Sequence, residues 1–287
     1  MTSFTSKQLR VTFILAGTKQ TFPGTGNNTL VLTNLRMSSK TQGVARQATQ
    51  LDLKIMGMKP EDMNALTVAW ANLPVVLNHL VILEANDGTG WVQVFKGTIV
   101  EAQPQFTAQP DVYFHCLASV GYFQKIAAAP PTSYPFTVDI GVAAGDIIQA
   151  MGFKYVDGGA SGVLTNPYFT GTLYDQLVQA CAAANADFYL QGDTILVTPH
   201  GLPRQSQPAV VLNKDTGLIG YPVFERAGLN VLAIWNSAFQ TGTPVQLSSS
   251  IPSANGRWYP FALTHTLEAN LPKGRWDTHL QCLKVVA

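Results

Sequence analysis

The sequence predicts a mainly β protein in which two β-barrel domains flank a smaller α+β domain. Two observations predict this fold class. Short β-prone runs alternate with Gly, Pro, Asn and Asp over residues 1 to about 120 and again over residues 213–287, a pattern typical of antiparallel sheets and small barrels. Helical periodicity is concentrated instead between two proline-rich breaks. We therefore expect three domains, at residues 1–125, 132–205 and 206–287.

The first domain is expected to contain a series of strands. Apolar and polar side chains alternate at residues 9–15 and 51–55, so each of these strands has one buried and one wetter face. The Asn-Asp-Gly-Thr-Gly segment at residues 86–90 predicts a hairpin turn. Further strands are expected around residues 79–85, 91–102 and 111–118.

One helix is predicted in this domain, beginning at Pro60. Proline suits the first helical turn, and the two acidic residues that follow complement the helix dipole. Met63, Leu66 and Trp70 recur at i, i+3 and i+7, which places one apolar stripe against the sheet. Strands closed over by a single helix would form a small barrel with a helical plug.

The middle domain is expected to combine two helices with a hairpin. Asp146 is predicted to cap a short helix that ends at Gly152. Thr172 is predicted to begin a longer helix, with Asp175 in a capping-box position. A Gly-Asp loop at residues 192–193 is typical of a type II′ hairpin. The buried stripe and C-terminal stop expected for the longer helix are Leu173, Leu177, Cys181, Ala184 and Asn185.

The composition favours a protein with large permanent contacts. Charged residues make up 12% of the chain, about half the usual fraction. Neutral polar groups cost less to desolvate than charges, which favours assembly over the alternative of a weakly charged sheet protein.

A net charge of +1 offers no field to attract nucleic acid or anionic lipid. No apolar run spans a bilayer and no signal core begins the chain, so we expect no membrane-spanning segment and synthesis in the cytoplasm.

No catalytic, cofactor-binding or metal-binding residues are predicted. The Gly24-Thr25-Gly26 segment lacks the Gly-Lys-Ser/Thr of a phosphate loop and is expected to form a turn before a strand. A glycosidase needs two carboxylates that face one cleft, with aromatic side chains that hold the sugar. One such alternative stays open, a carbohydrate cleft at Asp157 near three aromatic residues. Those aromatic residues are Tyr155, Tyr168 and Phe169.

The histidines lack helical metal-site spacing and the cysteines lack CxxC spacing. We therefore expect packing histidines and buried thiols at His79, His115, His200, His265, His279, Cys116, Cys181 and Cys282.

Three tryptophans in the last domain are candidates for either the core or an interface. Trp235 is expected to lie in the barrel core. Trp258 and Trp276 each follow a turn glycine, so for these two both alternatives stay open, because an interface anchor would bury a large area on assembly.

Motifs in all three domains resemble the tailed-phage baseplate hub family, which also occurs in contractile injection systems. The strongest series is C-terminal: a Gly-Leu-Ile-Gly-x-Pro entry into a strand at residues 217–222, an Asn-Gly-x-Trp turn at 255–258, a His-x-Leu-Glu strand at 265–268 and a Gly-x-Trp-x-Thr loop at 274–278. Near the N-terminus, a Leu-Arg pair precedes a loop containing Gly43, a strand at 51–57 and the Met-Asn-x-Leu helix. The resemblance covers about four-fifths of the chain.

The resemblance implies a structural virion protein without enzymatic activity or cofactor: the central baseplate hub, joining the hexameric tail tube to the trimeric spike or tip. It further implies two tube-like barrels, a homotrimer, partners among the tube, spike and other baseplate proteins, and DNA only as passing cargo. Two alternatives stay open. One is the hub of a phage-derived contractile bacteriocin or injection system, and the other is a cell-wall carbohydrate-binding or degrading tail enzyme.

Overall fold

The computed structural model describes residues 6–16, 21–67, 78–106, 112–204, 208–226 and 228–285. The chain is mainly β, with 49% strand and 14% helix, as the sequence predicts. It separates into two compact units. The first comprises Met1–Thr41, Gln50–Phe123 and His265–Trp276, and the second comprises Gln42–Thr49, Gln124–Thr264 and Asp277–Ala287.

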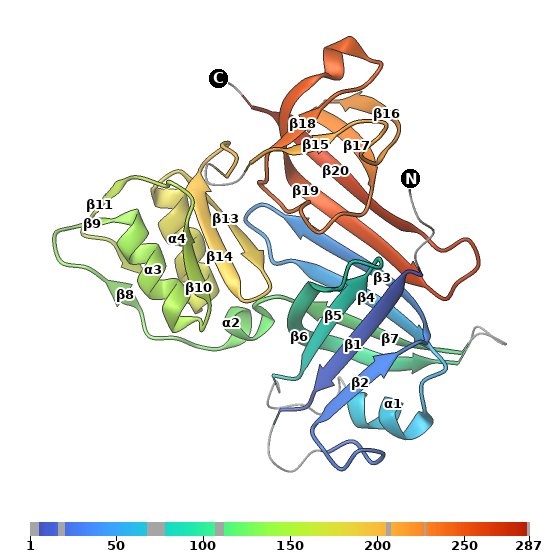
Figure 1. Ribbon diagram of the computed structural model, residues 1–287. Coiled ribbons are helices and arrows are strands. Elements are labelled where there is room, and N and C mark those ends of the chain that lie inside the picture. Colours follow the sequence, from blue (N-terminus) through green and yellow to red (C-terminus); the bar gives the residue numbers. More distant parts are fainter. Residues whose placement is uncertain are drawn as a thin grey trace. The chain divides into compact units, whose positions relative to one another are not determined.

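The first unit consists of antiparallel strands and one short helix (Figure 1). The elements that lie wholly or mostly in it are β1 (Gln8–Ile14), β2 (Thr29–Thr33), β3 (Arg36–Val44), β4 (Gln50–Met56), α1 (Pro60–Leu66), β5 (Leu80–Asn86), β6 (Trp91–Gln105) and β7 (Tyr113–Ser119). Alternate residues of β1, β4 and β5 are buried. Phe13 and Phe114 meet edge to face in this core, with ring centroids 6.3 Å apart.

Most sequence predictions for this unit are confirmed. The expected strands correspond to β1, β4, β5, β6 and β7, and residues 86–90 connect β5 to β6 as a hairpin. Pro60 lies in the first turn of α1, and Met63 and Leu66 are buried. Trp70 lies outside the described residues. Gly43 was expected in a loop, which is wrong: it lies in β3, because that strand pairs with the distant β19 (Gly256–Ala269), a contact that no local pattern reveals.

The second unit contains an α+β part. Its elements are β8 (Thr132–Ser133), β9 (Thr137–Asp139), α3 (Ile140–Ala150), β10 (Lys154–Asp157), β11 (Val163–Thr165), β12 (Tyr168–Phe169), α4 (Leu173–Ala183), β13 (Ala186–Gln191) and β14 (Thr194–Pro199), preceded by α2 (Tyr122–Ile126). The helices α3 and α4 pack against each other and against the sheet β10-β14-β13 (Figure 1). The ribbon pairs β8–β12 and β9–β11 run antiparallel beside them.

The predicted cap of the first of these helices is wrong. Asp139, not Asp146, is the N-cap of α3, and its Oδ1 accepts a hydrogen bond of 2.7 Å from the backbone N–H of Gly141. Asp146 lies inside the helix and accepts a hydrogen bond from Tyr134. Two glycines in the first half of α3 hide its helical character in the sequence, but the ring of Tyr155 packs over Gly145 and stabilises the helix there.

The longer helix agrees better with its prediction. Thr172 and Asp175 form the expected capping box of α4. Leu177 and Cys181 are buried, whereas the outer members of the predicted stripe are only half-buried. Gln176 is fully buried instead, because its amide donates to the carbonyls of Pro130 and Gly171 and accepts from Thr132. The stop at Asn185 and the turn at Gly192 are confirmed by left-handed φ angles of 50° and 55°.

The remainder of the second unit is a strand-rich part with its own apolar core. Its elements are β15 (Val210–Leu212), β16 (Leu218–Glu225), β17 (Gly228–Ile234), β18 (Val245–Leu247), the 3-10 helix η2 (Pro252–Ala254), β19 and β20 (Trp276–Lys284). Val231, Phe239, Trp258 and Leu280 are among the residues that form the core. Gly228, with φ of 148°, lies so close to β20 that a Cβ there would be 2.1 Å from the carbonyl oxygen of Cys282, so only glycine fits.

Thirteen described strands belong to one hydrogen-bonded sheet. Its order is β16-β17-β20-β19-β3-β4-β7-β6-β5-β1-β2, with β18 attached to β19 and β15 to β18. Residues 274–278 were expected to form a loop, but β20 begins at Trp276, because its pairing with β17 extends down to Asp277. Both ends of this order, β16 and β2, are strands with a single partner among the described residues.

Candidate functional site

The residues singled out for chemistry are not brought together into a catalytic site in the described part of the chain. Gly26 donates to the carbonyl of Phe22 in a turn that precedes β2, as expected. Asp157 accepts a hydrogen bond from the backbone of Gly159, so it stabilises a turn. Of the aromatic residues near it in sequence, Phe169 is buried in the core. No group of three or more His, Cys, Asp or Glu residues within the described ranges has the arrangement of a metal site.

The cysteines are buried thiols, as predicted. Burial raises the pKa of the Cys181 and Cys282 thiols to about 12, so these groups stay protonated at neutral pH. All three tryptophans are buried: Trp235, Trp258 and Trp276 are each no more than 6% exposed. The core prediction for Trp235 is confirmed, and the alternative left open for the other two is resolved in favour of burial within the chain.

The histidines occupy separate environments. His115 contacts the carboxylate of Asp52 at 2.9 Å, and His79 accepts a hydrogen bond from the backbone of Ala16. His279 is half-buried in β20. His265 is buried in β19, and this burial lowers its pKa from 6.5 to about 4.

His265 predicts a specific loss of stability in acid. The unfolded chain binds a proton at this histidine near pH 6.5, whereas the folded chain binds it only near pH 4. Stability is therefore full above pH 6.5 and falls as the pH drops towards 4, by roughly 3 kcal/mol in all at about 1.4 kcal/mol per pH unit. Denaturation curves between pH 7 and pH 4 measure this loss. We expect His265→Gln to flatten the profile; a variant that keeps the slope of the unmodified chain would contradict the assignment.

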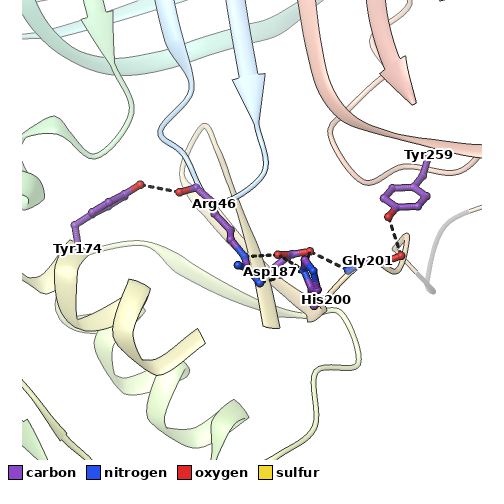
Figure 2. A network of polar contacts seen from close by, with 6 residues as sticks. All are labelled: Arg46, Tyr174, Asp187, His200, Gly201 and Tyr259. Atoms are coloured by element: carbon purple, nitrogen blue, oxygen red, sulfur yellow. Dashed lines mark hydrogen bonds and ion pairs between the residues drawn. The ribbon is translucent and has the colours of Figure 1, made fainter. Parts of the chain in front are cut away.

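A polar network of the second unit joins the loop after β3 to the α+β part (Figure 2). Residues 45–49 form this loop, and Arg46 lies at its tip with φ of 61°. The Arg46 side chain forms an ion pair with Asp187, whose carboxylate is only 8% exposed. His200 Nδ1 lies 3.1 Å from both oxygens of Asp187, and the backbone N–H of Gly201 donates to the same carboxylate at 3.1 Å.

Backbone contacts reinforce this network. The hydroxyl of Tyr174 in α4 donates to the carbonyl of Arg46 at 3.1 Å, and the backbone N–H of Arg46 donates to the carbonyl of Phe188. The hydroxyl of Tyr259 in β19 donates to the carbonyl of Gly201 at 2.7 Å (Figure 2). The network therefore acts as a structural clamp that holds three segments of the second unit together.

Breaking the clamp should cost measurable stability. In Asp187→Asn, the Arg46 guanidinium loses a charged acceptor, and we expect a loss of about 1–2 kcal/mol, moderated because Arg46 is 42% exposed. Chemical denaturation measures this change. Asp193→Asn is the matched control, because Asp193 forms only an exposed ion pair with Lys154 at 3.7 Å, and we expect it to change stability by less than about 0.5 kcal/mol. Indistinguishable denaturation midpoints would show that the clamp contributes nothing.

The second notable feature is an exposed apolar surface on β16. Ile219, Tyr221, Val223 and Phe224 are exposed, although the strand contains almost no polar residue. A groove of about 630 Å³ lies beside it, lined by Lys214, Leu218, Tyr221 and the three serines at residues 248–250. This surface was not expected from the sequence. The residues that could have indicated it are the near-continuous apolar run of β16. A strand that is apolar on both faces is normally buried on both faces, so an exposed strand of this kind needs a covering partner.

A family model decides the relationship of the chain to known proteins. The model described as baseplate hub gp41 matches residues 39–270. This chain belongs to the baseplate hub gp41 family. The match includes the Arg46 clamp and the whole of β16, and it confirms the resemblance in the sequence. Among curated proteins, no sequence matches the chain.

Solved structures share the fold of this hub-family chain. A tail protein from Neisseria meningitidis MC58 is 10% identical, with a TM-score of 0.64 over 96% of both chains. The 43 kDa tail protein of prophage MuSo2 from Shewanella oneidensis is 8% identical, with a TM-score of 0.61 over 96% of this chain and 98% of that chain. The E. coli c3393 protein, a component of the type VI secretion system, is 9% identical, with a TM-score of 0.60 over 96% of this chain and 77% of that chain.

Family membership gives the chain a structural role in the phage tail baseplate, as a component of the virion tail. The exposed strand edge and the structural clamp described above fit a role in assembly. Within the described residues, no helix has the length and apolar character needed to cross a membrane.

Proposed function

We propose that this chain is the central hub of the baseplate: a homotrimer that joins the hexameric tail tube to the trimeric spike or tip and forms part of the channel for DNA. In this proposal, residues 1–125 and 206–287 are two tube-like barrels, and residues 132–205 decorate the ring or meet the spike. Three copies with two barrels each would present six barrels towards the tube and threefold symmetry towards the spike. The hub then resolves the mismatch between the two symmetries.

The observation that carries the proposal is the family match over residues 39–270. The exposed apolar surface of β16 supports it, because a strand edge of this kind needs a protein neighbour. The low charged fraction of 12% supports a large permanent contact in the same way.

The solution mass of the purified full chain tests the proposal. One chain has a mass of 31.0 kDa, so a homotrimer should give about 93 kDa by light scattering, three times that mass. Electron microscopy of the same sample should then reveal a threefold ring with a central opening. A chain that stays monomeric at high concentration and is absent from purified tails would overturn the proposal.

A second candidate is the hub of a phage-derived bacteriocin or injection system. The specific observation in its favour is the shared fold with the E. coli c3393 protein, whose own similarity is to T4 bacteriophage tail proteins gp27 and gp5. The physical task of the hub is the same in both cases. The genes next to this one distinguish the two, since capsid genes accompany only a phage.

Turnover of peptidoglycan is the remaining alternative, and Asp157 is its candidate carboxylate. We expect the purified chain to release no soluble fragments from peptidoglycan. Release that is abolished in Asp157→Asn would establish an enzyme.

A further inference from the structure

The outer edge of β16 is an unpaired apolar strand edge. Among the described strands, only β17 pairs with β16. Tyr221 is 71% exposed and Val223 is 57% exposed, and Ile219 and Phe224 are exposed beside them. An uncovered edge with these side chains is a template for pairing with another chain. The edge therefore has the properties of a surface that becomes buried on assembly.

Among the described strands, the C-terminal half of β6 has a second unpaired edge. The pairing of β5 with β6 ends at Thr98, whereas the pairing of β7 with β6 continues to Gln105. Within the described residues, no strand pairs with residues 100–105 on the side away from β7. Pro104 lies in this half, and proline is confined to edge positions in sheets. Phe106 follows directly and is 62% exposed.

We propose that these two edges pair between copies, so that β16 of one chain adds to residues 100–105 of β6 in the next chain. The inference rests on the proposed homotrimer. A threefold ring requires a heterologous contact, in which two different surfaces of the same chain meet. The edges of β16 and β6 are two such surfaces, and main-chain hydrogen bonds between them would provide the affinity, as in other cases of strand addition.

The side chains of the two edges are compatible in an antiparallel pair. Both existing neighbours, β17 and β7, pair antiparallel with their strands, so a continued antiparallel pattern is the simplest extension. It places Phe106 near the N-terminal half of β16, where Tyr221 borders the groove. Two exposed aromatic rings then cover each other. Gln103 and Gln105 are uncharged, but β6 and β16 each carry one glutamate, Glu101 and Glu225. With Val223 directly opposite Gln103, these two carboxylates would face each other, as would Pro104 and Pro222. The favoured register is therefore offset by one residue, which separates the like charges.

Cross-linking of introduced cysteines tests this contact in the full chain. The variant carries both Val223→Cys and Gln103→Cys and is treated with a short-armed bismaleimide, which tolerates a one-residue slip in register. The three native cysteines are buried, so the background should be low. The controls are each single variant and a chain with Val223→Cys and Val31→Cys. Val31 is exposed on β2, the strand at the other end of the sheet order.

We expect covalent trimers on a denaturing gel from the Val223→Cys and Gln103→Cys chain. A mixture of the two single variants should give only covalent dimers, which proves that the link joins different chains. Three outcomes would overturn the inference. Dimers from Val223→Cys alone would indicate a symmetric contact between two β16 strands, and trimers that form only with Val31→Cys would indicate that β16 pairs with β2. Cross-linked monomers would indicate a contact within one chain.

The mass of the unmodified protein separates failure of the inference from failure of the proposed function. If light scattering gives a trimer and no Val223 to Gln103 link forms, the strand contact is wrong and the hub proposal stands. If the unmodified chain is a monomer and no link forms, the strand contact is wrong, and the hub proposal is overturned with it if the chain is also absent from purified tails. A second test uses Phe106→Ala and Tyr221→Ala. We expect each to weaken the trimer and the double variant to weaken it by less than the two effects combined, because both remove the same contact.

Discussion

Replacement of Val231 by proline is expected to prevent folding of the strand-rich part of the second unit. Val231 lies in β17, between β16 and β20, opposite Leu280, and it is 3% exposed. Proline removes a backbone donor in the middle of a sheet, and its ring fixes φ near about −65°, away from the roughly −140° of an antiparallel strand. We expect a loss of roughly 3–5 kcal/mol, which is a large part of the stability of a typical domain. The readout is the soluble yield, the circular dichroism spectrum and incorporation into tails.

Val231→Ala is the matched control, because it removes side-chain packing and keeps the backbone donor. We expect it to fold with a smaller loss of stability, about 1–2 kcal/mol, and to enter tails. Normal particles containing the Val231→Pro chain would contradict the position of β17 inside the sheet. Equal effects of both variants would show that side-chain packing, not the backbone ladder, determines the outcome.

Replacement of Trp258 by alanine is expected to destabilise the chain itself, not only its assembly. The indole N–H donates to the carbonyl of Ala254 at 2.8 Å, and the ring lies in the core of the second unit. Loss of a buried tryptophan costs about 3–5 kcal/mol, through lost burial and the cavity that remains. Phe224 of β16 packs edge to face against this ring, with centroids 6.5 Å apart, so the exposed edge should lose support as well.

Thermal denaturation of Trp258→Ala measures this effect, and Trp91→Ala is the matched control. Trp91 is 37% exposed and lies under the guanidinium of Arg10, 4.4 Å from the ring centroid, so we expect its loss to cost no more than about 1 kcal/mol. If Trp258→Ala keeps its melting temperature and fails only in assembly, the side chain is an interface anchor and its place in the core is wrong.

Local sequence patterns were sufficient to predict most helices, strands and turns. The capping box of Thr172 and Asp175, the proline that starts α1 and the hairpin turn at Gly192 involve contacts within a few residues. Such contacts depend on backbone geometry and one side chain, so residue type predicts them. The cap of α3 was predicted wrongly because Asp139 and Asp146 are equally suitable by type, and the two glycines of α3 weaken the helical signal between them.

The clamp could not be predicted in the same way. Arg46 and Asp187 are 141 positions apart, and neither residue is unusual in its own segment. Their contact exists because the loop after β3 is fastened by Ala45 to β19 and by Arg46 to β13. Contacts between segments so far apart in the sequence leave no periodic pattern. The alternation of apolar residues in a strand shows which of its faces is buried, but not which other strand lies beside it.

The sequence by itself determined the strand-rich character, the starts of α1 and α4 and the hub family, because these follow from local propensity, caps and an ordered series of turn motifs. The tertiary structure alone decided which strands are neighbours, that Trp258 and Trp276 are buried, and which edges of the described strands have no partner. The physical reason is that an apolar run has the same appearance whether its partner lies within the chain or in another copy. Only the strand order reveals that β16 has one covered side and one that is still exposed.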